Sequence, residues 1–133
     1  MNEINIKLRR EQLCIVKEYF FPYMQQLKKT RVLNVAHLST QSPELLQVLA
    51  INCLTDECML QVNRKLYNTS KQNVRLQFTY AQAVVLFKLL QELPIPSNQF
   101  YLVQTARYLV ELIDKELLRH HVYEVGNIAS HSS

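Results

Sequence analysis

The amino-acid sequence predicts a mainly helical fold of the α+β class, a bundle of about four helices with a small two-stranded β-ribbon. Most of the chain repeats apolar residues every three or four positions, the spacing of an amphipathic helix. Two short segments, 4–8 and 74–78, instead alternate apolar and polar residues, as half-buried strands do. The 133 residues are 48% apolar and 20% charged, a composition typical of one globular domain. The alternative is an all-α bundle in which residues 4–8 extend the first helix.

The two alternating segments lie 70 residues apart, and the sequence around one resembles the sequence around the other. Under a shift of 70 residues the apolar positions coincide: Ile4, Ile6 and Leu8 fall on Val74, Leu76 and Phe78. Gln12 falls on Gln82, and each segment leads into a helical pattern. We therefore expect a single domain over 1–125 with two similar strand–helix–helix halves, about 3–69 and 73–120, and a flexible tail over 126–133. Because short strands need paired backbone groups, the two segments should pair and turn these apolar residues toward the helices.

The first helix is predicted over Arg9–Lys29. Its apolar stripe recurs at spacings of three and four: Leu13, Val16, Phe20, Tyr23 and Leu27. Pro22 lacks a backbone donor and clashes with the preceding turn, which predicts a kink or a break near Phe21. Residues Thr30–Gln41 are polar and irregular enough to form a connection.

The second helical segment, Pro43–Asn68, begins with a start signal at Ser42-Pro43-Glu44. Its apolar residues fall on two opposite sides: Leu45, Leu49, Cys53, Leu60 and Tyr67 on one, and Val48, Ile51, Cys58, Val62 and Leu66 on the other. Either one long helix is covered on both faces, or Thr55-Asp56-Glu57 caps a second helix after a break. The sequence leaves both arrangements open.

Two further helices follow the second strand. Thr79 can cap a helix over Tyr80–Leu93, which Pro94 and Pro96 end. A last helix is predicted from about Asn98 to His120. Its inward stripe consists of six apolar residues: Leu102, Ala106, Leu109, Val110, Ile113 and Leu117.

The sequence offers no pattern for catalysis or for a cofactor. Gly126 is the single glycine, which excludes Gly-rich phosphate loops, dinucleotide fingerprints and the Gly-x-Ser-x-Gly elbow. The spacing of Cys53 and Cys58 fits neither a redox pair nor a zinc knuckle, and His120 and His121 diverge by about 100° on a helix. We therefore expect a protein that is not an enzyme, with no catalytic residue, cofactor, metal or small-molecule ligand.

The cellular location is predicted from the apolar segments of the sequence and from its number of cysteines. The first ten residues contain no apolar run of signal-peptide length, and no segment has the uninterrupted apolar length of a membrane span. An odd number of cysteines, three, cannot form a complete disulfide framework. These features favour a cytoplasmic protein without a membrane partner.

The positive charge is uneven and suggests one kind of partner. The chain has a net charge of +4, and residues 1–40 carry seven basic and three acidic side chains. If the strands pair, four basic residues gather on the outer side of the ribbon with an aromatic residue beside them: Lys7, Arg9, Arg10, Arg75 and Tyr80. Basic groups next to an aromatic ring can grip nucleic-acid phosphates and bases, so these five are candidate nucleic-acid contacts.

The second kind of partner is another protein. A monomer easily buries only one side of the 43–68 helix, and Phe21 lies on the otherwise charged side of the first helix. The candidate residues for self-association are Phe21, Val48, Ile51, Met59, Val62 and Leu66. A central helix wrapped by the others would need no partner. The leading hypothesis is a small non-catalytic cytosolic interaction or regulatory protein that forms a homodimer or binds another protein. The alternative is a nucleic-acid-binding protein.

Overall fold

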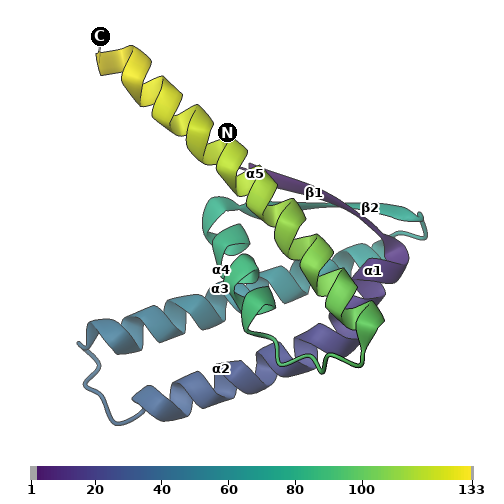
Figure 1. The fold of residues 1–133 in the computed structure, drawn as a ribbon. Coiled ribbons are helices and arrows are strands. Elements are labelled where there is room, and N and C mark those ends of the chain that lie inside the picture. The colour runs from purple at the N-terminus through teal and green to yellow at the C-terminus, as the bar shows by residue number, and fades with distance from the viewer. Residues whose placement is uncertain (1–2, 133) are drawn as a thin grey trace.

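The computed structural model describes residues 3–132, and it describes side chains for residues 3–120. The elements follow one another as β1 (Glu3–Arg9), α1 (Arg10–Ile15), a π-helix η1 (Val16–Phe20), α2 (Phe21–Val35), α3 (Pro43–Asn68), β2 (Asn73–Thr79), α4 (Tyr80–Glu92) and α5 (Phe100–Ser132). The ribbon lies across one end of the helices, and α5 crosses in front of them (Figure 1). The predicted mainly helical fold with a small β-ribbon is confirmed, and the all-α alternative is set aside because residues 3–9 form a strand.

The two strands pair antiparallel with the predicted apolar residues facing one another. Ile4 lies opposite Phe78, Ile6 opposite Leu76 and Leu8 opposite Val74, and all six side chains are buried in the core. Ile6 and Leu76, which coincide under the shift of 70 residues, also face each other, so an approximate two-fold axis passes through this pair.

The two strands also lead into their helices in the same way. The backbone N–H of Arg9 donates to Oε1 of Gln12 at 2.9 Å, and that of Thr79 donates to Oε1 of Gln82 at 2.9 Å. In addition, the Thr79 hydroxyl accepts from the Gln82 backbone N–H at 3.2 Å, which confirms the predicted cap. The glutamines at corresponding positions therefore perform the same local task.

The first helical region changes type where Pro22 predicts a kink or break. Residues Val16–Phe20 form a π-helix, and the N–H of Phe21 donates to the carbonyl of Val16, five residues back. Pro22 then lies in the first turn of α2, where its missing donor costs least. The helix continues to Val35, beyond the predicted end at Lys29, because residues 30–35 contain neither Gly nor Pro. The predicted connection over Thr30–Gln41 is correspondingly shorter.

The question left open for residues 43–68 is answered by one continuous helix. Helix α3 runs from Pro43 to Asn68, with Ser42 as its N-cap residue. Its buried residues lie on one face in its C-terminal two thirds: Asn52, Thr55, Cys58, Met59, Val62 and Leu66. This face joins a core that β1, β2, α1, α4 and α5 also line.

Helix α5 covers the core through the predicted stripe. Ala106, Leu109 and Ile113 are buried, and Leu102, Val110 and Leu117 pack partly buried against them. Its backbone continues to Ser132, past the predicted end at His120 and into the predicted tail at 126–133, of which residue 133 lies outside the described residues. No proline follows Pro96, and one glycine costs a helix only about 1 kcal/mol.

Helices α2 and α3 pack as an antiparallel hairpin whose connected ends extend beyond the core (Figure 1). We call residues 25–51 the arm. No side chain of the arm is buried, whereas Met24 and Asn52, which flank it, both are. The core therefore occupies the ribbon end of the molecule, and α3 belongs to both parts.

Candidate interaction surface

The structure places most of the predicted self-association residues inside the protein. Phe21, Met59, Val62 and Leu66 are buried in the core, which corrects their assignment to a surface. For Phe21 the cause is η1: a π-turn holds one more residue than an α-turn, so the following residues are rotated by about 100°. For the three α3 residues the cause is packing of their face against the core. Val48 and Ile51 are half-buried on the arm.

The opposite side of α3 carries the apolar surface that remains exposed. Its residues are spaced by three, four, seven and seven positions, which keeps them on one side of the helix. We call them the exposed stripe: Leu46, Leu49, Cys53, Leu60 and Tyr67. The exposed fractions of the four large side chains range from 49% for Leu60 to 91% for Tyr67. At 1.5 Å per residue, the exposed stripe is about 30 Å long.

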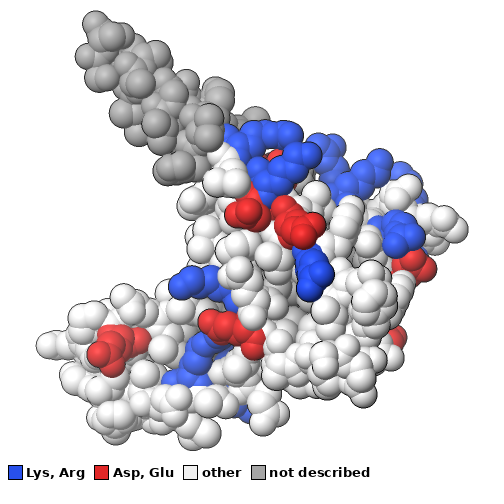
Figure 2. Space-filling view, in the orientation of Figure 1, with Lys and Arg blue, Asp and Glu red and all other residues white. Residues whose placement is uncertain are grey.

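The arm adds exposed apolar side chains with few charges among them. Val32 and Leu33 of α2 are both exposed. In the space-filling view the arm, at the lower left, shows scattered charges, whereas basic side chains gather at the ribbon end (Figure 2). Arg31 is neutralised within the protein by Glu92 of α4, at 2.8 Å.

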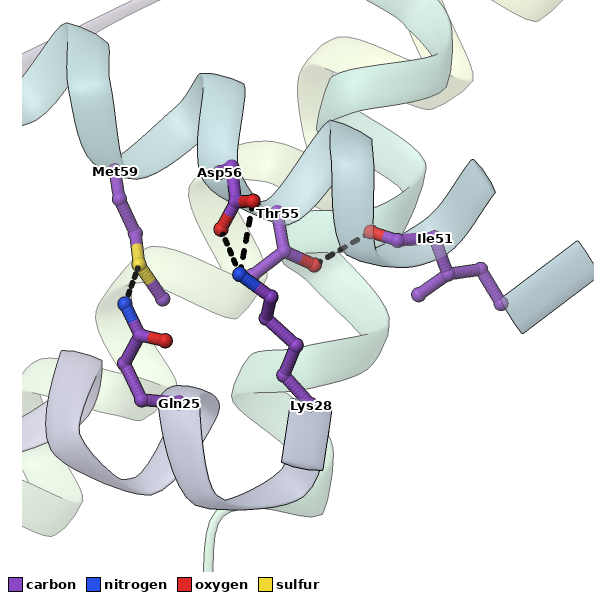
Figure 3. Close-up of polar contacts among 6 residues, drawn as sticks. All are labelled: Gln25, Lys28, Ile51, Thr55, Asp56 and Met59. Atoms are coloured by element: carbon purple, nitrogen blue, oxygen red, sulfur yellow. Dashed lines mark hydrogen bonds and ion pairs between the residues drawn. The ribbon is translucent and has the colours of Figure 1, made fainter. Parts of the chain in front are cut away.

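Polar contacts hold α2 against α3 at the base of the arm (Figure 3). The Lys28 ammonium lies 2.7 and 2.8 Å from the two carboxylate oxygens of Asp56, and the Gln25 amide donates to the Met59 sulfur at 3.4 Å. Thr55, considered as a cap for a second helix, instead donates its hydroxyl to the Ile51 carbonyl at 2.7 Å within α3. These contacts fix the α2 side of α3 and leave the exposed stripe uncovered.

Helix α3 also has the length and composition of a membrane span, with a mean hydropathy of 1.2 over eighteen residues. Only 28% of that window is buried. The high hydropathy arises because apolar residues occupy two sides of the helix, one packed in the core and the other forming the exposed stripe.

Three of the predicted nucleic-acid contacts share the outer side of the ribbon. Lys7 lies directly opposite Arg75, and both are exposed. Arg9 is two residues further along the same side of β1, where it forms an ion pair with Glu11 at 3.1 Å. The ribbon therefore brings together the cations that its alternation predicts.

The other two predicted contacts lie elsewhere. The Arg10 guanidinium turns to the C-terminal end of α3, where it donates to the carbonyl of Leu66 at 2.9 Å and to that of Thr69. These carbonyls have no partner within the helix, so Arg10 stabilises a helix end. Tyr80 lies at the opposite end of the ribbon from Arg9, with its ring centroid 5.1 Å from that of His120. Neither residue belongs to the basic side of the ribbon.

A groove that sequence reasoning missed lies where β1 meets α5. It has a volume of about 550 Å³ and is lined by eight residues: Arg9, Gln12, Tyr101, Gln104, Thr105, Arg107, Tyr108 and Glu111. The sequence signal was the pair of tyrosines seven residues apart, which places both on one side of α5. That α5 meets the end of β1 depends on tertiary packing and is not visible in the sequence.

The remaining reactive groups are dispersed. Within the described part of the chain, no three His, Cys, Asp or Glu side chains come together in a way that could hold a metal ion. Burial, together with the nearby Glu57 carboxylate, raises the pKa of the Cys58 thiol to about 12, so this thiol stays protonated at neutral pH.

Searches of protein-family models, curated proteins and solved structures found no match to this chain. What defines it is its own architecture, a mainly helical protein with a two-stranded antiparallel ribbon.

Proposed function

We propose that this protein is a non-catalytic interaction protein that self-associates through the exposed stripe of α3. The observation that carries the proposal is one helix with two apolar sides, one in the core and one exposed along its length. An exposed apolar surface of this extent usually marks a contact with a partner. The recurrence of Leu46, Cys53, Leu60 and Tyr67 every seven residues suits packing against another helix.

A second copy of the chain fits this surface better than other partners. Two copies of α3 related by a two-fold axis present the same apolar length to each other. Charge repulsion between them is small, because Asp56 is paired with Lys28 and Glu57 accepts a hydrogen bond from the Gln82 amide at 2.8 Å. Asp56 and Asn63, seven and fourteen residues after Leu49, interrupt the apolar seam with polar groups. We therefore expect a reversible dimer rather than an obligate one.

A lipid surface is the other occupant to consider. Helices that lie on membranes concentrate basic residues beside their apolar face. Helix α3 instead carries Glu44, Asp56 and Glu57 together with Arg64 and Lys65. This mixture of signs favours a protein partner over an anionic lipid surface.

Sedimentation equilibrium over a range of protein concentrations tests the proposal. The wild-type mass should rise with concentration from 15.7 kDa toward twice that value. Leu60→Asp should leave a folded monomer, because it places a charge on the exposed stripe without disturbing the core. The matched control is Leu118→Asp, an exposed leucine of α5 outside the stripe and the arm, which should keep the wild-type behaviour.

Two outcomes would overturn the proposal. One is a wild-type chain that stays monomeric at all concentrations and instead floats with lipid vesicles, which would assign the stripe to a membrane. The other is a dimer that Leu60→Asp leaves intact, which would place the interface on another surface. Circular dichroism of each variant separates lost association from lost folding.

A further inference from the structure

We propose a second binding site, for single-stranded nucleic acid, in the groove between the end of β1 and α5. The groove is open, and its α5 wall carries two tyrosines with exposed fractions of 54% for Tyr101 and 46% for Tyr108. Gln104 lies between them on the same side of the helix. Two exposed aromatic side chains on one side of the helix, with an amide between them, offer faces on which bases stack.

Cations border these aromatic side chains from two elements. Arg107 of α5 and Arg9 of β1 both line the groove. Lys7 and Arg75 continue the positive surface from Arg9 along the outer side of the ribbon. In Figure 2 several basic side chains gather at this end of the molecule, with acidic ones among them.

The pairing of Lys7 with Arg75 favours a bound anion. The backbone N–H and C=O of Gln77 bond to the Gln61 side chain at the outer edge of β2, so Gln77 belongs to a non-hydrogen-bonded pair of the ribbon. Lys7 and Arg75 lie two residues along and form the same type of pair, in which side chains approach most closely. Like charges directly opposite each other destabilise a sheet, and no ion pair of the described residues includes either one. A phosphate between them would remove this repulsion.

The acidic groups of the groove determine how a strand would lie. Glu11 pairs with Arg9 on the surface, and such exposed pairs are weak enough for a phosphate to displace the carboxylate. Glu111 lines the α5 side and repels phosphates there. The backbone should therefore follow Arg9, Lys7 and Arg75, with the bases turned toward Tyr101 and Tyr108. A duplex keeps its bases stacked inside and cannot use these rings.

This site is independent of the proposed self-association, because it uses β1, β2 and α5 and none of the exposed stripe. The test is the fluorescence anisotropy of a labelled oligouridine of about twelve nucleotides at low salt, about 50 mM. We expect the wild-type chain to bind. Tyr101→Ala and Tyr108→Ala should each weaken binding by roughly five- to 150-fold. The matched control is Tyr19→Ala, an equally exposed tyrosine outside the groove, which should bind as the wild type does.

The salt dependence supplies a second readout. Arg75→Ala should reduce the slope of log affinity against log salt by about 0.7, the value for one phosphate contact on a single strand. The control, Arg64→Ala on α3, should leave the slope unchanged. No binding at low salt, equal losses in Tyr19→Ala and Tyr108→Ala, or preference for a duplex of the same length would each overturn the proposal.

Discussion

Two cysteines five residues apart in α3 show how one helix creates two chemical environments. Cys53 is exposed on the stripe, whereas Cys58 is buried and donates its thiol to the carbonyl of Gln82 at 3.6 Å. Removal of the thiol from water raises the pKa of Cys58 from 9.0 to about 12, and the Glu57 carboxylate adds to this rise. Cys58 is therefore a core residue. Because the thiolate is the nucleophilic form of cysteine, a thiol that burial keeps protonated is a poor nucleophile.

The raised pKa of Cys58 predicts a loss of stability at alkaline pH. Between pH 9 and 12 the unfolded chain releases the thiol proton, while the folded chain retains it. Because the folded state then binds more protons, the free energy of unfolding falls as the pH rises, by at most about 1.4 kcal/mol per pH unit. Below pH 9 this thiol contributes no pH dependence. Urea unfolding under reducing conditions between pH 8 and 11 measures the effect.

The comparison is between variants, so that all other groups of the chain are the same in both proteins. Cys58→Ala should lose stability less steeply with pH than the wild type, and Cys53→Ala is the matched variant that removes an exposed thiol from the same helix. Equal slopes in the wild type and Cys58→Ala would show that the buried thiol does not contribute.

Arg10 shows why some single residues escape sequence reasoning. In the helical pattern it is simply a basic residue at a polar position. In the structure its guanidinium bonds to the carbonyls of Leu66 and Thr69, more than fifty residues away. A glutamate there would face the negative end of α3, so Arg10→Glu affects folding.

At the scale of elements, the ribbon is held by the core on its inner side and by α3 at the edge of β2. Its inner side is buried against the helices. The outer edge of β2 is paired by an α3 side chain: Gln61 accepts from the Gln77 N–H at 2.7 Å and donates to the Gln77 carbonyl at 2.5 Å. This amide pairs both backbone groups of one residue, Gln77, on the edge of β2.

The ribbon predicts opposite outcomes for its two sides. Leu76→Ala should lower the free energy of unfolding by about 2–5 kcal/mol, because it leaves a cavity at a position only 2% exposed. Lys7→Ala should have little effect or stabilise slightly, because it removes the repulsion with Arg75 opposite. Chemical denaturation of both variants measures the difference. A large loss in Lys7→Ala would mean that its side chain supports the fold.

The elements differ in how well the sequence predicts them, and the reason is physical. Residues 4–8 and 74–78 are predictable because a period of two leaves one arrangement that buries all the apolar side chains. Which side of α3 is buried cannot be predicted in this way, because Val62 and Leu60 lie on opposite sides of the helix that are equally apolar in the sequence. Only the packed core selects between them. The inward rotation of Phe21 depends on the π-helix η1. Pro22 indicates that the helix is interrupted near this point, but it does not indicate that the interruption is a π-helix.

At the scale of the whole molecule, stability is unevenly distributed. The ribbon, α1, η1, α4, α5 and the C-terminal part of α3 contribute the buried core, whereas the arm over 25–51 contributes no buried side chain. Segments with few buried contacts open locally at low free energy. A partner that covers the exposed stripe would therefore order the arm as well as bind it.

This distribution predicts a concentration-dependent pattern of amide hydrogen exchange. At low protein concentration the α3 amides of the arm, 47–51, should exchange faster than those of α4, because buried side chains hold α4 in the core. At high concentration self-association should slow exchange in 47–51, since Leu46 and Leu49 of the stripe then become covered. In Leu60→Asp the same amides should stay fast at every concentration, while α4 remains protected in both proteins. Protection of 47–51 that is already complete in the dilute wild type would show that the arm is stable without a partner, and the link between dimerisation and arm order would fail.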